Sequence, residues 1–241
     1  MKKKSKKIVV LLSGGLDSST LAYLATKPSL CSNNRVFSLT FNYGQRHSKE
    51  LNSAKKIARE IGLIEHKIIK IDLKSWGGSS LTDKRLALPV NRNFKLTHKS
   101  IPNTYVPARN TVFLAFALAY AEAINADEIH LGVNCLDYSG YVDCRPVYIK
   151  KFQELIKLAT VKGIQGKAVK IKTPLINKTK SEIIKLGQKY GVDWGKTWSC
   201  YKGEKLACGV CDSCQLRLKG FMEAGSKDPL KYKQFPKFYS G

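Results

Sequence analysis

Residues 13–19 have the composition of a loop that binds phosphate. They read Ser-Gly-Gly-Leu-Asp-Ser-Ser and follow an apolar run at residues 8–12, which suits a buried strand of a parallel sheet. The two glycines let the backbone turn sharply and approach a ligand closely. The hydroxyl groups at residues 18–20 can cap the next helix, whose free N–H groups and dipole favour a bound anion. Beside this anion, the Asp17 carboxylate is best explained by a cation that bridges it to phosphate oxygens.

The type of phosphate chemistry follows from what surrounds the glycines. No Gly-Lys-Ser or Gly-Lys-Thr follows them, so transfer of a γ-phosphate by a Walker-type loop is disfavoured. The pattern Ser-Gly-Gly-x-Asp-Ser resembles the PP-loop ATP pyrophosphatase family. This resemblance implies cleavage of ATP between its α and β phosphates.

Four cysteines near the C-terminus have the spacing of a metal site. Their pattern, C-x7-C-x2-C-x2-C, can place four thiolates around one ion, and the residues are Cys200, Cys208, Cys211 and Cys214. Tetrahedral zinc is the first interpretation, and an iron–sulfur cluster on the same thiolates is the alternative. A zinc ion with four sulfur ligands has no open position for water, so we expect one structural ion that fastens the C-terminal segment to the core.

The remaining three cysteines, Cys31, Cys135 and Cys144, have no such spacing and are interpreted as small buried residues.

Short apolar strands alternate with helices along the chain, which indicates an α/β fold with a doubly wound parallel sheet. We expect helices at residues 48–61 and after Pro107, which can form the first turn of a long helix. The expected strands are residues 8–12, 35–41, 66–71 and 128–133. Ligands should gather at the carboxyl ends of the strands, where Ser13 and residues 41–47 and 134–145 fall.

The length of 241 residues and the 43% hydrophobic content allow one sizeable core, and no Pro/Gly/Ser-rich linker divides the chain. We expect a nucleotide-binding core at residues 1–191 and a zinc-binding extension at residues 192–241, packed on the same domain. Residues 72–106 show little periodicity, which predicts a lid or substrate loop, with a disordered insertion as the alternative. Residues 179–182 fit a capping box that places Lys180 in the first turn of a late helix.

The net charge of +24 is typical of proteins that bind nucleic acids. However, 34 of the 42 basic residues are lysines spread along the chain, which a general lysine bias explains as well, so we expect no nucleic-acid partner. Only five apolar residues follow the basic N-terminus, and the apolar stretch at residues 112–124 is too short to span a bilayer. We therefore expect a cytoplasmic protein without a membrane segment.

Several segments together resemble the 7-cyano-7-deazaguanine synthase family within the PP-loop group. They extend over nearly the whole chain: residues 13–18 (SGGLDS), 43–47 (YGQRH) with Glu50, 101–110 (IPNTYVPARN), 137–141 (DYSGY) with 143–145 (DCR), and 197–201 (TWSCY) before 208–214 (CGVCDSC). One departure is Val142, where the family commonly has proline, and this changes the stiffness of the loop.

The resemblance implies an adenine nucleotide alpha hydrolase-like, Rossmann-like fold and an ATP-dependent carbon–nitrogen ligase. The implied reaction converts 7-carboxy-7-deazaguanine and free ammonia into 7-cyano-7-deazaguanine through an activated carboxylate and an amide, in queuosine biosynthesis. It also implies Mg²⁺ with ATP, and a homodimer. The alternatives are a PP-loop enzyme that modifies tRNA by thiolation and a zinc-stabilised nucleic-acid-binding protein without catalysis.

Site residues are expected in three groups beside the metal ligands. The expected catalytic residues are Asp17, Lys180, Arg109 and Arg145, because the departing pyrophosphate and the substrate carboxylate need cations. The residues expected to bind the substrate are Asp137, Asp143 and Arg145: the carboxylate of Asp137 or Asp143 can accept from the adjacent N–H donors of a guanine-like ring, and the Arg145 guanidinium can hold the substrate carboxylate. The residues expected to bind ATP are Leu12, Ser13, Gly14, Gly15, Leu16, Asp17, Ser18, Ser19, Thr20, Leu21 and Ala22.

His47 is interpreted as a structural residue rather than a base. Trp198 and Tyr201 are interpreted as side chains that pack over the metal loop, with stacking on the substrate ring as the alternative.

Overall fold

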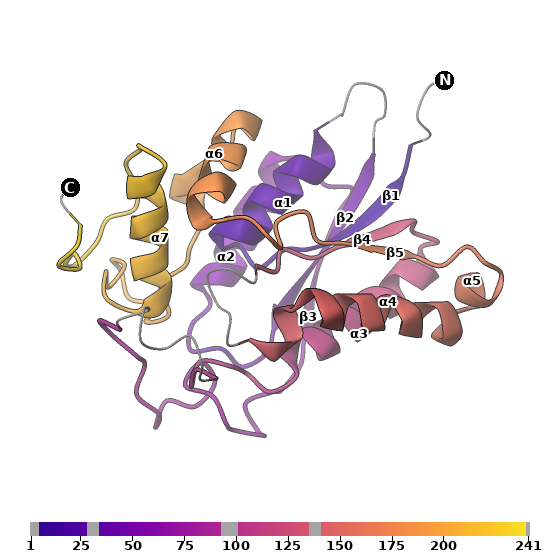
Figure 1. The fold of residues 1–241 in the computed structure, drawn as a ribbon, viewed down its shortest axis with the longest axis horizontal. Helices are drawn as coiled ribbons and strands as arrows, with labels where there is room; N and C mark the ends of the chain where they lie inside the picture. Colours follow the sequence, from indigo (N-terminus) through magenta and orange to yellow (C-terminus); the bar gives the residue numbers. More distant parts are fainter. Residues whose placement is uncertain (1–4, 28–33, 93–100, 135–140, 240–241) are drawn as a thin grey trace.

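The computed structural model describes residues 5–27, 34–92, 101–134 and 141–239, and its centre is a five-stranded sheet (Figure 1). All neighbouring strands are parallel, in the order β3-β2-β1-β4-β5. The strands are β1 (Lys7–Leu11), β2 (Arg35–Asn42), β3 (Glu65–Lys70), β4 (Glu128–His130) and β5 (Lys170–Lys172). The predicted doubly wound parallel sheet is confirmed. The strand β5 was not predicted.

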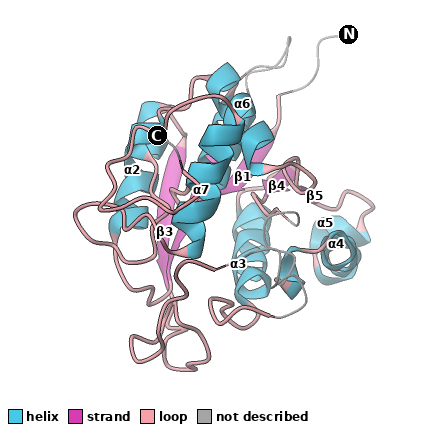
Figure 2. Ribbon diagram, turned by 60° about the vertical axis from the view of Figure 1, so that its left-hand side comes forward, coloured by secondary structure: helices cyan, strands magenta, loops and turns pink. Residues whose placement is uncertain are grey.

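Helices cover both faces of the sheet (Figure 2). They are α1 (Leu16–Thr26), α2 (Lys49–Glu60), α3 (Arg109–Ala123), α4 (Pro146–Ala159), α5 (Val161–Ile164), α6 (Lys180–Tyr190) and α7 (Asp212–Glu223). Because successive side chains of a strand point to opposite faces, β1 contributes to two cores. Val9 and Leu11 pack with α3 and α4, while Ile8 and Val10 pack with α1, α2 and α6.

Two predicted boundaries were wrong. Strand β4 ends at His130 rather than at residue 133, because the chain at Gly132 passes against the backbone of α1, where a side-chain carbon would lie 3.3 Å from the Ser18 nitrogen. Helix α3 does not begin at Pro107. Its N-cap is Ala108, in the left-handed conformation with a φ of 51°, so the proline precedes the helix instead of forming its first turn.

The described parts of the long segment at residues 72–106 pack on the sheet domain. Leu81 and Val106 belong to the core under α3, and Ser79 and Ser80 are fully buried. The Arg46 guanidinium donates to backbone carbonyls of this segment, among them Asp83 O at 2.9 Å. The disordered alternative is therefore wrong for residues 72–92 and 101–106.

The C-terminal segment, which contains α7, packs against α6. Trp194 and Phe221 join the core formed by α1, α2 and α6, with their rings edge to face at 5.8 Å. The buried Arg217 of α7 forms an ion pair with the buried Asp228, with Nε to Oδ2 at 2.6 Å. The boundary at residue 191 stays a prediction. Among the helices of the described residues, none is long and apolar enough to cross a bilayer.

The predicted capping box at the start of α6 is confirmed, and it gives a first testable prediction. Thr179 Oγ1 accepts from Glu182 N at 3.2 Å, and Glu182 Oε2 accepts from Thr179 N at 2.7 Å. Replacing Thr179 by alanine removes the hydroxyl acceptor and should lower the free energy of unfolding in urea by about 1 kcal/mol. Ser181→Ala, in the same turn without a cap bond, is the control. An equal loss in both variants would contradict the role of the cap.

Candidate functional site

A cavity of about 280 Å³ lies at the carboxyl ends of β1, β2 and β4. Three chain segments that follow these strands meet in it, represented by Ser13, Tyr43 and Asn134. This is the place predicted for a ligand in a doubly wound sheet. Residues from α3, α6 and the C-terminal segment close the cavity, including Arg109, Lys180 and Trp198.

The glycine-rich loop turns between β1 and α1 against the start of α2. Gly14 has a φ of 82°, and a side-chain carbon at this position would overlap the carbonyl oxygen of Glu50 and lie 2.6 Å from Ala54 N. Only glycine fits both the left-handed backbone and this close approach. The loop is therefore held by the N-terminal half of α2.

The predicted hydroxyl caps of α1 were wrong. The N-cap is Gly15, which makes no side-chain bond, and the helix begins at Leu16. Ser18, Ser19 and Thr20 lie inside the helix, where their hydroxyls donate to carbonyls of the preceding turn, as Ser19 Oγ does to Gly15 O at 2.6 Å. The helix begins earlier than expected, so its first N–H groups have no hydroxyl cap and start beside the cavity.

Residues 12–22 divide into two groups by their position. Leu12, Ser13, Gly15, Leu16, Asp17 and Ser18 line the cavity. The following residues, Ser19, Thr20, Leu21 and Ala22, are buried in α1, and the last two belong to a hydrophobic core. The end of the strand, the loop and the first helical turn are thus the part of this segment that borders the cavity.

Lys180 and Asp17 form an ion pair in the cavity wall. Lys180 Nζ lies 2.8 Å from both carboxylate oxygens of Asp17. The side chains are 11% and 25% exposed, so this contact is largely shielded from solvent. The first turns of α1 and α6 therefore bring one carboxylate and one ammonium group to the glycine-rich loop.

Arg109 enters the cavity from the first turn of α3. Its Nη1 donates to the Tyr43 hydroxyl at 3.3 Å, and the guanidinium lies over the rings of Tyr43 and Phe113 at 5.7 and 6.0 Å from their centroids. A charged group packed between aromatic faces is held in position. Arg109 thus places a fixed positive charge opposite the loop.

Glu50 was missing from the predicted site residues, although it was noted beside the YGQRH motif. It lies in the first turn of α2 and lines the cavity. Burial raises the pKa of its carboxyl to about 7, and the Arg109 charge partly opposes this rise. The signal that could have found it is an acidic residue close behind a strand end, where ligands bind in this fold.

Two of the residues predicted to bind the substrate make contacts outside the cavity. Asp143 is buried and accepts from Asn110 N at 3.0 Å, so it holds the first turn of α3. Arg145 is exposed, is the N-cap of α4, and donates to Val142 O at 3.1 Å. Neither side chain lines the cavity. Asp137 and Cys135 lie outside the described residues.

His47 and Trp198 join the cavity to the cysteine segment. The His47 ring packs closely on Gly203, where a side-chain carbon would overlap it, and burial lowers the pKa of the imidazole. Trp198 Nε1 donates to Cys200 O at 2.9 Å, and its ring belongs to the cysteine cluster, so its predicted packing is confirmed. Trp198 N also donates to Gly14 O at 2.9 Å, which links this segment to the glycine-rich loop.

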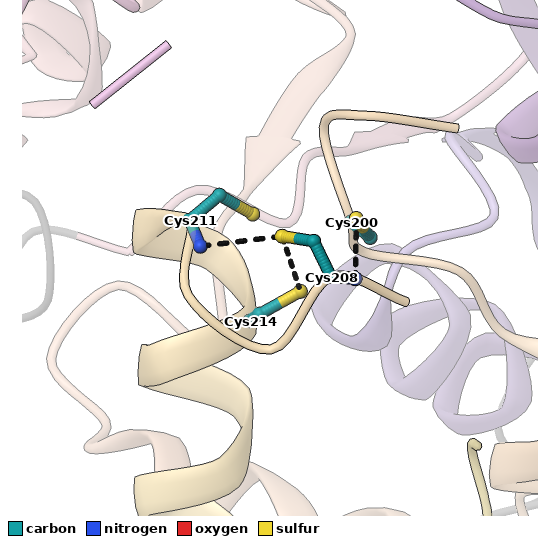
Figure 3. A group of neighbouring side chains, drawn as sticks. All are labelled: Cys200, Cys208, Cys211 and Cys214. Atoms are coloured by element: carbon teal, nitrogen blue, oxygen red, sulfur yellow. Dashed lines mark hydrogen bonds between the residues drawn. The ribbon is translucent and has the colours of Figure 1, made fainter. Parts of the chain in front are cut away.

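The four cysteines come together at the N-terminus of α7 (Figure 3). All four are buried, and their sulfur atoms lie within 4.8 Å of one another, with 3.9 Å between Cys208 and Cys214. Four thiolates at a zinc–sulfur distance of about 2.3 Å stand about 3.8 Å apart in a tetrahedron. The group can therefore hold a metal ion.

Comparisons with known proteins agree with this geometry. The family model described as "Queuosine biosynthesis protein QueC" matches residues 7–225. A 7-cyano-7-deazaguanine synthase of Trichodesmium erythraeum is 56% identical over 224 residues, which cover 93% of this chain and 99% of the relative. The synthase of the same name from Nostoc sp. is 54% identical over 226 residues, covering 94% and 97%. A third, from Prochlorococcus marinus, is 56% identical over 217 residues, covering 90% and 94%.

Proposed function

This chain belongs to the QueC family of queuosine biosynthesis proteins, and from this we propose that it is an ATP-dependent ligase that makes 7-cyano-7-deazaguanine. The substrates are 7-carboxy-7-deazaguanine, ammonia and ATP. A carboxylate is a poor electrophile, so its oxygen must first become part of a leaving group. Activation by ATP followed by attack of ammonia gives the amide, and a second activation of the amide oxygen allows the nitrile to form.

The observation that carries the proposal is the meeting of the glycine-rich loop with two cations in one cavity. The first turn of α1, which has no side-chain cap, offers backbone N–H groups to an anion, and Lys180 and Arg109 line the same cavity. Negative charge grows on pyrophosphate as the bond between the α and β phosphates breaks. Donors and cations held in place before the reaction stabilise this charge.

The proposed assignments of individual residues follow their positions. Ser13, Gly15, Leu16 and Ser18 bind the phosphates, while Gly14 shapes the loop through its contact with α2. Asp143 acts as a positioning residue, because it holds Asn110, the neighbour of Arg109. Arg145 and Asp137 remain predictions for contacts with the deazaguanine substrate.

We also propose Mg²⁺ at Asp17, whose carboxylate lines the cavity beside the loop. Magnesium in nucleotide sites is commonly bound by one or two carboxylates together with substrate phosphates, and Asp17 suits this arrangement. When bound, the ion neutralises phosphate charge.

The ion proposed for the four cysteines is zinc with a structural role. A single ion suits sulfur atoms within 4.8 Å of one another, whereas an iron–sulfur cluster spreads its thiolates further apart. Four sulfur ligands leave no position for substrate, so the ion would hold the C-terminal segment against the cavity.

The test is to incubate the purified protein with 7-carboxy-7-deazaguanine, ammonium and Mg-ATP and to follow the small molecules by mass spectrometry. Nitrile formation that disappears in Asp17→Ala would support both the reaction and the phosphate loop. Absence of amide and nitrile from a folded, zinc-loaded sample would overturn the proposal. Retained activity of the double variant Cys135→Ser with Cys144→Ser would argue against the thiolation alternative, which needs catalytic cysteines outside the metal group. The homodimer stays a prediction that sedimentation can measure.

A further inference from the structure

The proposed reaction makes an unusual demand on its site. Ammonia is present in neutral solution mainly as ammonium, whose nitrogen has four bonded protons, and the nitrogen of the nitrile product has none. The site must therefore accept four protons from one nitrogen atom, two before the amide is complete and two during the formation of the nitrile. The inference that follows rests on the proposed function, because this demand comes from its chemistry.

Glu50 has the position required of such a proton acceptor. Its backbone carbonyl touches the glycine-rich loop at Gly14, so its side chain starts beside the loop proposed to bind the nucleotide phosphates. It lines the same cavity as Arg109 and Lys180. The bond to be broken in the activated substrate joins the carboxyl carbon to an oxygen of the nucleotide phosphate, and this position lies next to the loop.

The Glu50 carboxylate is also available for a ligand. Among the described residues, no hydrogen bond and no ion pair reaches its oxygen atoms, although the Arg109 charge favours the ionised form. Asp17, the other carboxylate of the cavity wall named above, pairs with Lys180 through both oxygens and is the carboxylate already proposed for Mg²⁺. A carboxylate without a hydrogen-bonded or ion-pair partner in a cavity attracts a small cation such as ammonium.

We propose that the carboxylate of Glu50 binds ammonium and acts as the base that removes the protons from its nitrogen.

In the first half of the reaction, Glu50 takes one proton from ammonium and leaves ammonia. The nitrogen lone pair forms the bond to the activated carboxyl carbon, and the π electrons of the carbonyl move to its oxygen. When the tetrahedral intermediate collapses, the bond to the nucleotide oxygen breaks and its electron pair leaves with AMP. A second proton passes from nitrogen to Glu50 after the first has been released to solvent, which leaves the amide.

In the second half, the amide oxygen is activated by a second ATP. Glu50 accepts the two remaining N–H protons one after the other. The N–H electron pairs form the carbon–nitrogen triple bond, while the carbon–oxygen bond breaks with its electron pair on the departing group. A base that repeatedly takes and releases protons near neutral pH works best with a pKa near that pH, and burial raises the pKa of Glu50 to about 7.

The other groups that face Glu50 suit this role less well. Tyr43, directly after β2, has its pKa raised by burial, so its hydroxyl stays protonated. Arg109 on α3 and Lys180 on α6 are cations in the cavity wall and cannot bind ammonium. His47, on the loop before α2, packs on Gly203, and burial lowers the pKa of its ring. Cys144 accepts from Asn110 Nδ2 at 3.3 Å, and Cys200, whose charge also raises the pKa of Glu50, belongs to the metal group.

The test compares two nucleophiles in Glu50→Gln. Hydroxylamine is largely unprotonated at neutral pH, so it can attack the activated carboxylate without a base and give a hydroxamate. We expect hydroxamate formation within threefold of wild type, but amide formation from ammonium slower by about 10²-fold or more. In wild type the rate of amide formation should fall as pH falls through about 7, because protonation removes the base, and Glu50→Gln should lose this step.

Glu60→Gln is the matched control, because Glu60 lies on the same helix and faces Lys196 at 3.1 Å, away from the cavity. If Glu50→Gln does not fold, Glu50→Ala with added formate replaces it, and formate should restore amide formation. An equal loss with both nucleophiles, or unchanged amide formation, would overturn the role of Glu50. A wild-type enzyme that forms neither amide nor hydroxamate would instead overturn the proposed function.

Discussion

Replacing Lys180 by methionine should lower the rate of substrate-dependent exchange between ATP and pyrophosphate by about 10²- to 10³-fold. The exchange reports only the activation step, so it isolates the charge that develops on pyrophosphate. Lys180 Nζ lies 2.8 Å from Asp17 at the glycine-rich loop, and its side chain is only 11% exposed. A cation held in such a shielded place stabilises a developing anion more strongly than one in water.

The loss has a second cause. Without Lys180, the Asp17 carboxylate keeps its charge beside the loop and repels the phosphates. The double variant Asp17→Asn with Lys180→Met should therefore recover thermal stability relative to Lys180→Met alone, but not exchange activity, because the two residues interact directly.

Lys185→Met is the control for this prediction. Lys185 is exposed on the same helix α6, so its loss should leave both the exchange and the melting temperature close to those of wild type. Exchange that survives in Lys180→Met, or that falls equally in Lys185→Met, would show that Lys180 does not stabilise the departing pyrophosphate.

Removal of the metal should release the C-terminal segment and abolish activity. Structural zinc sites contribute about 10–16 kcal/mol of apparent binding free energy, which is as large as the total stability of most domains. The four ligands connect the loop at Cys200 with α7, and the Trp198 amide of the same segment bonds to Gly14 O at 2.9 Å. Loss of the ion therefore acts on the glycine-rich loop through this bond.

The expected result for Cys208→Ser is less than one zinc ion per chain by elemental analysis, a lower melting temperature and faster hydrogen exchange in residues 197–239. Cys144→Ser is the matched control, since Cys144 is a buried cysteine outside the metal group and its loss should leave the zinc content unchanged. Iron with visible absorption in the purified protein would favour a cluster, and full stability without metal would refute the structural role.

Features encoded by neighbouring residues were predictable. The apolar run behind the glycine-rich loop specified β1, and the alternation of strands with helices specified the doubly wound sheet. The capping box at Thr179 and the spacing of the cysteines were also read correctly, because caps and metal clusters depend on residues a few positions apart. Where a helix begins was harder to predict. We expected Pro107 in the first turn of α3, but the N-cap is Ala108 in the left-handed conformation, and we expected hydroxyl caps for α1, but its N-cap is Gly15.

The sequence by itself determined the family, the parallel sheet and the groups that could bind phosphate and metal, because these depend on short motifs. Only the tertiary structure decided which charges meet. Lys180 and Asp17 are 163 positions apart and pair because α1 and α6 pack together on the same face of the sheet. The Asp143 carboxylate accepts a hydrogen bond from the backbone of α3, whereas Glu50 lines the cavity. A carboxylate has the same chemistry at each position, and the packing of helices against the sheet decides whether it holds the fold or meets the substrate.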